Sequence, residues 1–85
     1  VEINNLEQLA EVIKSGAHIV MLDNMSIENM VKAVGIVDGR AVLEASGGIT
    51  IENVRDVAAT GVDLISIGAL THSVTAMDIS LDLET

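Results

Sequence analysis

The chain has 85 residues, no cysteine, and 13 acidic against 4 basic side chains, which gives a formal net charge of −9. This negative field disfavours DNA or RNA as a partner, and the absence of Phe, Tyr and Trp removes the rings on which single-stranded nucleic acid stacks. Because hydrophobic residues make up 49% of the chain, we expect a compact soluble unit and not a disordered segment.

The ends and composition of the chain also bear on its location. No apolar run reaches the roughly 20 residues that span a membrane, and nothing near Val1 resembles a secretory signal. The lack of cysteine fits a reducing compartment, so we expect a cytoplasmic protein. The chain opens without Met on residues typical of a strand, which suggests that an upstream part exists.

Short apolar stretches alternate with helical patterns along the whole chain. In chain order, the patterns predict a strand at 1–3, a helix at 6–16, a strand at 18–23, a helix at 27–37, a strand at 41–45, a helix at 51–61 and a strand at 63–69. Good N-cap side chains precede the helices: Asn4 or Asn5, Ser26 and Thr50. A glycine follows or ends each helical pattern: Gly16, Gly39 and Gly61.

This alternation predicts an α/β fold with a parallel sheet and crossover helices, in either a barrel or a doubly wound sheet. SIEN at 26–29 recurs as TIEN at 50–53, which supports repeated βα units. We expect residues 1–76 to form the C-terminal part of an α/β (TIM-like) barrel. Residues 77–83 alternate apolar and polar side chains, so we predict a half-exposed strand within 77–85 that packs on a domain absent from this chain.

Two acidic residues are expected at the ends of neighbouring strands, where parallel α/β proteins bind their ligands. Glu2 closes the first strand, and Asp23 closes the second. Two carboxylates at such a position can bind Mg²⁺ through a shell of waters, and they can also accept hydrogen bonds from sugar hydroxyls. The alternative is a pair of solvated loop acids with no ligand.

Glycines follow the next two strands, where main-chain N–H groups can approach an anion closely. Ser46, Gly47 and Gly48 precede a new helix, whose N-terminal amides would face the same anion. Gly68 and Ala69 offer a second such approach from the adjacent strand, as in barrel phosphate sites. The alternative is that these glycines only turn corners.

Three further polar side chains complete the expected picture. His72 follows the fourth strand and can pair with an anion or donate a hydrogen bond, and Glu44 lines the same pocket by position. His18 opens a strand at the opposite end, so we interpret it as a bystander.

The segments VEINNLEQL, MLDNMS, LEASGGIT with ENVR, TGVDLISIGALTHS and MDISLDL together resemble quinolinate phosphoribosyltransferase, in order and spacing, over the whole chain. The resemblance implies transfer of phosphoribose from phosphoribosyl diphosphate to quinolinate, with loss of CO₂ and diphosphate, in NAD synthesis. It also implies Mg²⁺, with Glu2 and Asp23 at the ribose hydroxyls and metal. The 5′-phosphate would be held by Ser46, Gly47, Gly48 and Gly68, with His72 near the anionic ligands.

One departure from the family pattern is the scarcity of basic residues for two carboxylates and a diphosphate. Lys14, Lys32 and Arg55 fall within expected helices, and Arg40 precedes a strand at the wrong end. We therefore expect the rest of the enzyme and a second subunit to supply the missing cations, and the isolated chain to be inactive. Two alternatives stay open: another phosphate-binding barrel enzyme, and a non-catalytic barrel fragment or scaffold.

Overall fold

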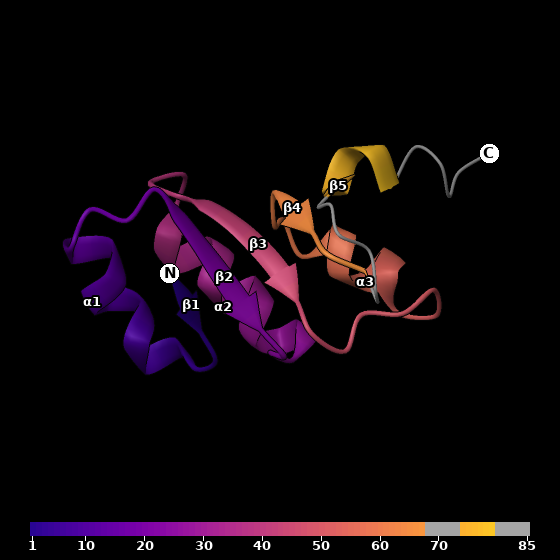
Figure 1. Cartoon of the computed structure of the whole chain (residues 1–85), viewed down its shortest axis with the longest axis horizontal. Helices are drawn as coiled ribbons and strands as arrows, with labels where there is room; N and C mark the ends of the chain where they lie inside the picture. The colour runs from indigo at the N-terminus through magenta and orange to yellow at the C-terminus, as the bar shows by residue number, and fades with distance from the viewer. Residues whose placement is uncertain (68–73, 80–85) are drawn as a thin grey trace.

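The chain folds into one twisted sheet with helices packed against it (Figure 1). The computed structural model describes residues 1–67 and 74–79. Its elements are β1 (Glu2–Ile3), the 3₁₀ helix η1 (Leu6–Gln8), α1 (Leu9–Lys14), β2 (Ile19–Asp23), α2 (Ile27–Val37), β3 (Val42–Ser46), α3 (Val54–Ala59), β4 (Leu64–Ile65) and β5 (Val74–Thr75). None of the helices in this described part is long and apolar enough to cross a membrane.

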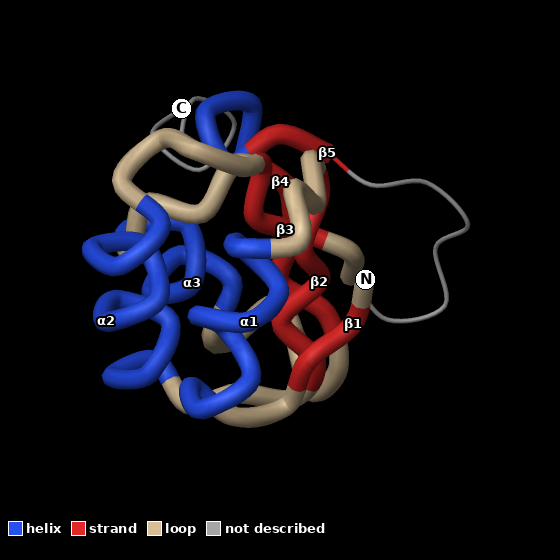
Figure 2. The backbone as a smooth tube through the Cα atoms, turned by 90° about the vertical axis from the view of Figure 1, so that its left-hand side faces the viewer, coloured by secondary structure: helices blue, strands red, loops and turns tan. Residues whose placement is uncertain are grey.

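The sheet has the strand order β1-β2-β3-β4-β5, and its first four strands are parallel. The helices α1, α2 and α3 all lie on one face of it (Figure 2). A doubly wound sheet reverses its strand order and carries helices on both faces, whereas a barrel keeps sequential order with helices only outside. The architecture therefore confirms the α/β class and favours a barrel segment over a doubly wound sheet.

The strand register separates a buried face from an open face. The residues in the rows that face the helices are no more than 2% exposed: Ile3, Val20, Leu22, Leu43, Ala45 and Ile65. They pack on the apolar sides of the helices, where Leu9, Met30 and Val57 are equally buried. Side chains alternate along a strand, so the intervening residues Glu2, Met21, Asp23, Glu44 and Ser46 share the opposite, open face.

Two predicted helix starts are confirmed. The Asn5 side chain accepts a hydrogen bond from the Gln8 amide, and the Ser26 hydroxyl accepts one from the Asn29 amide, each at 3.1 Å. The glycines after the helices have the expected left-handed backbone, with φ of 83° at Gly16, 79° at Gly39 and 98° at Gly61. The third helix differs, because it begins at Val54 and residues 51–53 form a turn.

The predicted strand at 77–83 is wrong where the structure describes it. Residues 76–79 form a helical turn, seen after β5 in Figure 1. The Thr75 hydroxyl accepts a hydrogen bond from the Asp78 amide at 3.1 Å, and this side-chain cap favours a helical turn over an extended chain. The short strand β5 pairs antiparallel with β4. The remainder of the 77–85 segment lies outside the described residues, and nothing tests the predicted packing on another domain.

Candidate functional site

The open face of the sheet carries three carboxylates near the carboxyl ends of its strands. Glu2 pairs in register with Met21, and Met21 pairs with Glu44, so the two glutamates occupy one row across three strands. Asp23 lies two residues further along β2, opposite Ser46. From ordinary strand spacings, the Cα atoms of Glu2 and Asp23 are roughly 8 Å apart. The predicted acid pair therefore shares one face and one end of the sheet.

The turn after β2 lies directly against the segment at 47–50, which we call the glycine loop. The Asn24 amide donates a hydrogen bond to the Ser46 carbonyl at 2.7 Å. A Cβ atom added to Gly47 would lie 2.9 Å from Asp23 Oδ1 and 3.0 Å from the Asn24 nitrogen. No side chain fits at Gly47 unless something moves, so the glycine is what lets Asp23 and the loop meet.

Both loop glycines also have a backbone that other residues avoid. Gly47 has φ of 78° and Gly48 has φ of 70°, and Asn24 opposite them has φ of 54°. A Cβ atom added to Gly48 would lie 3.0 Å from Asn24 Oδ1. The interpretation of these glycines as corner turns is thus correct but incomplete, because the same geometry exposes their main chain beside an acidic side chain.

The far side of the glycine loop is held by Asn53. Its Nδ2 donates to the Gly48 carbonyl at 2.9 Å, and its Oδ1 accepts from the Thr50 amide at 2.8 Å. The expectation that Thr50 is the N-cap of the third helix is wrong, because the residue directly before that helix is Asn53 and the Thr50 amide is bonded to the Asn53 side chain. By contrast, no hydrogen bond between described residues uses the amides of Gly47, Gly48 or Ile49.

Glu52 places a charge close to this loop. Hydrogen bonding from its own backbone amide, and then from the Thr50 side chain, lowers the pKa of Glu52 below its ordinary value of 4.5. The fully exposed carboxylate is therefore ionised at neutral pH. An anion at the glycine loop would have to bind against this negative charge.

Several predicted site residues lie outside the described part of the chain, namely Gly68, Ala69 and His72. The described residues directly after β4 run alongside the end of β3. The Ser66 amide donates to the Ala45 carbonyl at 3.0 Å, so the chain continues alongside the end of β3 after β4 stops at Ile65. That is the same end of the sheet as the glycine loop.

Lys32 and Arg40 lie away from the three carboxylates of the open face. Lys32 pairs with Glu28 along α2 at 3.3 Å. The Arg40 guanidinium donates to the Val37 carbonyl at 2.9 Å and also to the Ile36 carbonyl, so it caps the end of α2. Among residues 1–67 and 74–79, no three His, Cys, Asp or Glu side chains cluster closely enough to hold a metal ion by themselves.

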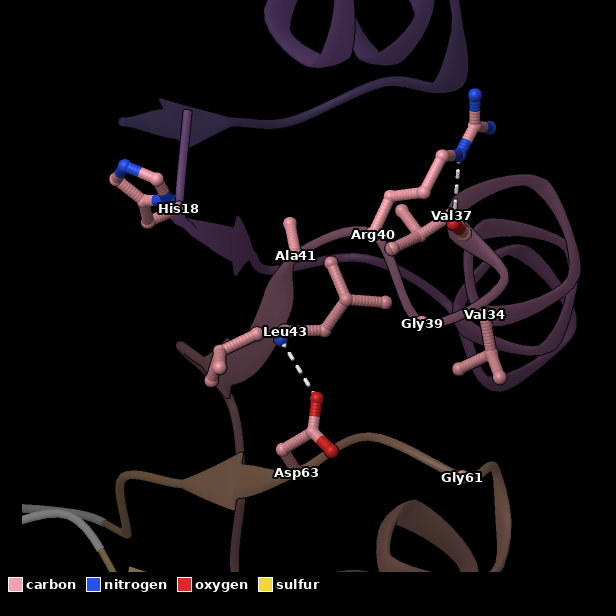
Figure 3. Close-up of a pocket in the computed structure, with 10 residues that line it drawn as sticks. His18, Val34, Val37, Gly39, Arg40, Ala41, Leu43, Gly61 and Asp63 are labelled. Atoms are coloured by element: carbon pink, nitrogen blue, oxygen red, sulfur yellow. Dashed lines mark hydrogen bonds between the residues drawn. The ribbon is translucent and has the colours of Figure 1, made fainter. Parts of the chain in front are cut away.

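A pocket of about 540 Å³ opens at the other end of the sheet (Figure 3). His18 and Arg40 line it, and Asp63 in its wall accepts a hydrogen bond from the Leu43 amide at 2.9 Å. Figure 3 shows the His18 ring and the Arg40 guanidinium directed away from each other. Arg40 and Asp63 bond to backbone groups here, and the role of His18 as a bystander stays a prediction.

Sequence reasoning missed the two asparagines that flank the glycine loop. Asn24 had a usable signal, because Asn is one of the few residues that tolerates positive φ next to a strand end. No sequence signal pointed to Asn53. The same motif at 26–29 ends in Asn29, whose backbone amide donates to Ser26, whereas the side chain of Asn53 makes the bonds to the glycine loop.

The amino-acid sequence matches one family model over residues 1–82, described as the quinolinate phosphoribosyl transferase C-terminal domain. The probable nicotinate-nucleotide pyrophosphorylase (carboxylating) of Methanocaldococcus jannaschii is 42% identical over 90 residues, which cover 98% of this chain and 32% of the relative. The Bacillus subtilis protein of the same name is 43% identical over 83 residues, which cover 98% of this chain and 29% of the relative. The chain thus spans about a third of the length of these relatives.

Solved structures give the same result. Nicotinate-nucleotide pyrophosphorylase from Ehrlichia chaffeensis superposes with a TM-score of 0.78 at 49% identity, over 84% of this chain and 26% of that one. The enzyme of that name from Francisella tularensis gives 0.77 at 45% identity, over 88% and 28%. The sequence motifs, the barrel-like strand order and these matches agree, and the chain belongs to the quinolinate phosphoribosyltransferase family as part of its C-terminal domain.

Proposed function

We propose that this chain supplies the ribose-phosphate end of an active site that joins phosphoribosyl diphosphate to quinolinate. The products are nicotinate mononucleotide, CO₂ and diphosphate. The observation that carries the proposal is the contact between Asp23 and the glycine loop, where a Cβ atom on Gly47 would meet Asp23 Oδ1 at 2.9 Å. An acid for sugar hydroxyls and a main-chain cradle for a phosphate thus adjoin each other at one end of the sheet.

Each predicted residue has a role in this proposal. Glu2 and Asp23 bind the ribose hydroxyls, and Glu44 in the same row as Glu2 lines the substrate pocket. The 5′-phosphate is bound by Ser46, Gly47, Gly48, Gly68 and Ala69. His72, which follows β4 in the sequence, contacts the anionic substrate.

Glu2 and Asp23 also suit Mg²⁺, which prefers carboxylate oxygens and retains several waters. Asp23 lies one strand away from both Glu2 and Glu44, with the same two-residue offset, and water or diphosphate oxygens would complete the coordination. When bound, the ion would offset the negative charge of the diphosphate.

The reaction breaks the bond from ribose C1′ to the diphosphate oxygen and forms one from C1′ to the pyridine nitrogen. Positive charge develops on the ribose as the diphosphate departs. Fixed carboxylates on the open face stabilise that charge, and the phosphate cradle holds C1′ at the distance that the pyridine nitrogen requires. The bond to the carboxylate next to the nitrogen then breaks and releases CO₂, and the electron pair left on that ring carbon takes up a proton from water.

Quinolinate and diphosphate still need cations that the open face does not offer. Lys32 and Arg40 are committed to the helix side and to the opposite end. The remaining part of a longer enzyme, and a second copy in a homo-oligomer, would provide them. We place this enzyme in the cytoplasm, which the cysteine-free composition favours. The names of some plant relatives describe those proteins as mitochondrial or chloroplastic.

A chimera tests the proposal. This chain would replace the matching segment of the Bacillus subtilis relative, and release of CO₂ from carboxyl-labelled quinolinate would be followed with and without phosphoribosyl diphosphate. We expect release only with both substrates, loss of it in Glu2→Gln, and none lost in Glu11→Gln on the exposed side of α1. A folded chimera that releases no CO₂, or turnover by the isolated 85 residues, would contradict the proposal.

A non-catalytic scaffold is the second candidate, and one observation favours it. Ile19 and Val42 on the open face are 53% and 38% exposed, so this face has an apolar half that could pair with another copy. Sedimentation of the isolated chain together with titration by ribose 5-phosphate distinguishes the two, because a scaffold that assembles through this face forms a defined oligomer and binds no ribose phosphate.

A further inference from the structure

The carboxamide of Asn53 joins two parts of the glycine loop. It donates to the Gly48 carbonyl at 2.9 Å and accepts from the Thr50 amide at 2.8 Å. A carbonyl can only accept and an amide N–H can only donate, so the Asn53 side chain has one possible orientation. These two bonds fix the planes of both peptides that flank Ile49.

The direction of the Ile49 N–H follows from the first of these bonds. The peptide between Gly48 and Ile49 is planar and trans, so its N–H points opposite to its carbonyl. With the Gly48 carbonyl turned to Asn53, the Ile49 N–H points away from Asn53. No hydrogen bond between described residues uses this amide, or those of Gly47 and Gly48.

The opposite side of the loop is fixed by the Asp23 turn. A Cβ atom on Gly48 would meet Asn24 Oδ1 at 3.0 Å, and the Asn24 amide is bonded to the Ser46 carbonyl. The loop therefore lies between two asparagines, and its three consecutive amides bond no other described residue. A loop held in this way loses little conformational freedom when it binds a ligand.

We propose that Asn53 is a positioning residue for the sugar phosphate, because it sets the direction of the Gly48–Ile49 peptide that presents an N–H to the phosphate. This inference rests on the proposed function and extends it to a residue on the far side of the loop. Asn53 touches no reacting atom. Its effect is on the affinity for phosphate.

The preceding βα unit contains a matched control. Asn29 occupies the equivalent place in SIEN at 26–29, but its backbone amide donates to the Ser26 hydroxyl that caps α2, and its side chain bonds no other described residue. Asn29→Asp adds the same charge near the start of the helix in the other unit, where Asn29 is the third residue of α2 and Asn53 is the residue directly before α3. The two variants thus differ in their distance from the glycine loop and match in their chemistry.

The test is a titration of the ¹⁵N-labelled chain with inorganic phosphate, followed through the amide shifts of Gly47, Gly48 and Ile49. Asn53→Asp keeps an acceptor for the Thr50 amide but loses the donor to Gly48, so we expect affinity at least about tenfold weaker. Asn53→Ser replaces the carboxamide by a shorter hydroxyl that cannot bond Gly48 and Thr50 together and adds no charge, and we expect about fivefold weaker binding. Asn29→Asp should bind within about twofold of the parent.

Urea midpoints recorded for every variant separate positioning from folding. A purely structural role would lower the midpoint of Asn53→Ser and leave the phosphate affinity of its folded molecules unchanged, which would overturn the inference. Equal affinity in the parent and in Asn53→Asp would overturn it as well. If phosphate shifts no glycine-loop amide in the parent chain, the proposed phosphate site itself fails and the inference fails with it.

Discussion

Replacing Gly47 by alanine tests the close approach between the glycine loop and the turn after β2. Gly47 has φ of 78°, and the new Cβ atom would lie 2.9 Å from Asp23 Oδ1 and 3.0 Å from the Asn24 nitrogen. The left-handed backbone costs an alanine about 1 kcal/mol. Because the second contact is with backbone, the turn must shift, which costs about 1–2 kcal/mol more.

Gly16→Ala is the matched control for this substitution. Gly16 has a similar φ of 83°, but a Cβ atom there would meet nothing within 4 Å. The control therefore carries the backbone cost alone, about 1 kcal/mol. With a urea m-value of about 1 kcal/mol/M for a chain of this size, we expect midpoints lowered by about 1 M for Gly16→Ala and by about 2 M or more for Gly47→Ala.

The refuting result is an equal loss of stability at both glycines. It would mean that the glycine loop and the Asp23 turn are not in contact, and that the Asp23 carboxylate and the amides of the glycine loop do not form one site. A second readout is the amide shift of Asn24, which should change in Gly47→Ala and stay unchanged in Gly16→Ala.

Three further predictions concern single side chains. Ser26→Ala removes the hydroxyl that accepts from the Asn29 amide, so thermal or urea unfolding should show a loss of about 1 kcal/mol, and no loss would contradict this cap. The pKa of Glu52 is lowered in the folded state, so its contribution is present above its unfolded pKa and lost as pH falls through the folded value. Urea unfolding between about pH 6 and pH 3 should therefore show a smaller loss in Glu52→Gln than in the parent, and identical profiles would refute that assignment. Asp23→Asn removes one carboxylate from the rim, and titration with Mg²⁺ should show weaker binding by about tenfold, whereas unchanged binding would exclude Asp23 as a ligand.

Much of the fold follows from local patterns that no tertiary contact overrides. The residues of β2 and β3 are short apolar runs between helices, and Ser26 and Asn5 act as helix caps exactly where their neighbours leave unpaired amides. The alternation of strands and helices, however, fits both a barrel and a doubly wound sheet. The sequential strand order and the position of all three α-helices on one face of the sheet favour the barrel. Both properties depend on contacts between distant parts of the chain.

The candidate site was predictable in its acids and glycines but not in the contacts that shape it. Asp23 and Gly47 follow strands that pair in parallel, so their proximity follows from topology. The two tetrapeptides SIEN and TIEN look equivalent in sequence, yet the preceding glycines let Asn53 reach back to Gly48. The helical turn at 76–79 was missed because a period-two pattern over so few residues does not exclude a turn capped by Thr75.

The most direct test of the central claim is an amide spectrum of the ¹⁵N-labelled chain with ribose 5-phosphate and a trace of Mn²⁺, which broadens signals near its binding site. The account predicts broadening at Glu2 and Asp23, together with phosphate-induced shifts at Gly47 and Gly48. Broadening and shifts at His18 and Arg40 instead, at the opposite end of the sheet, would contradict it.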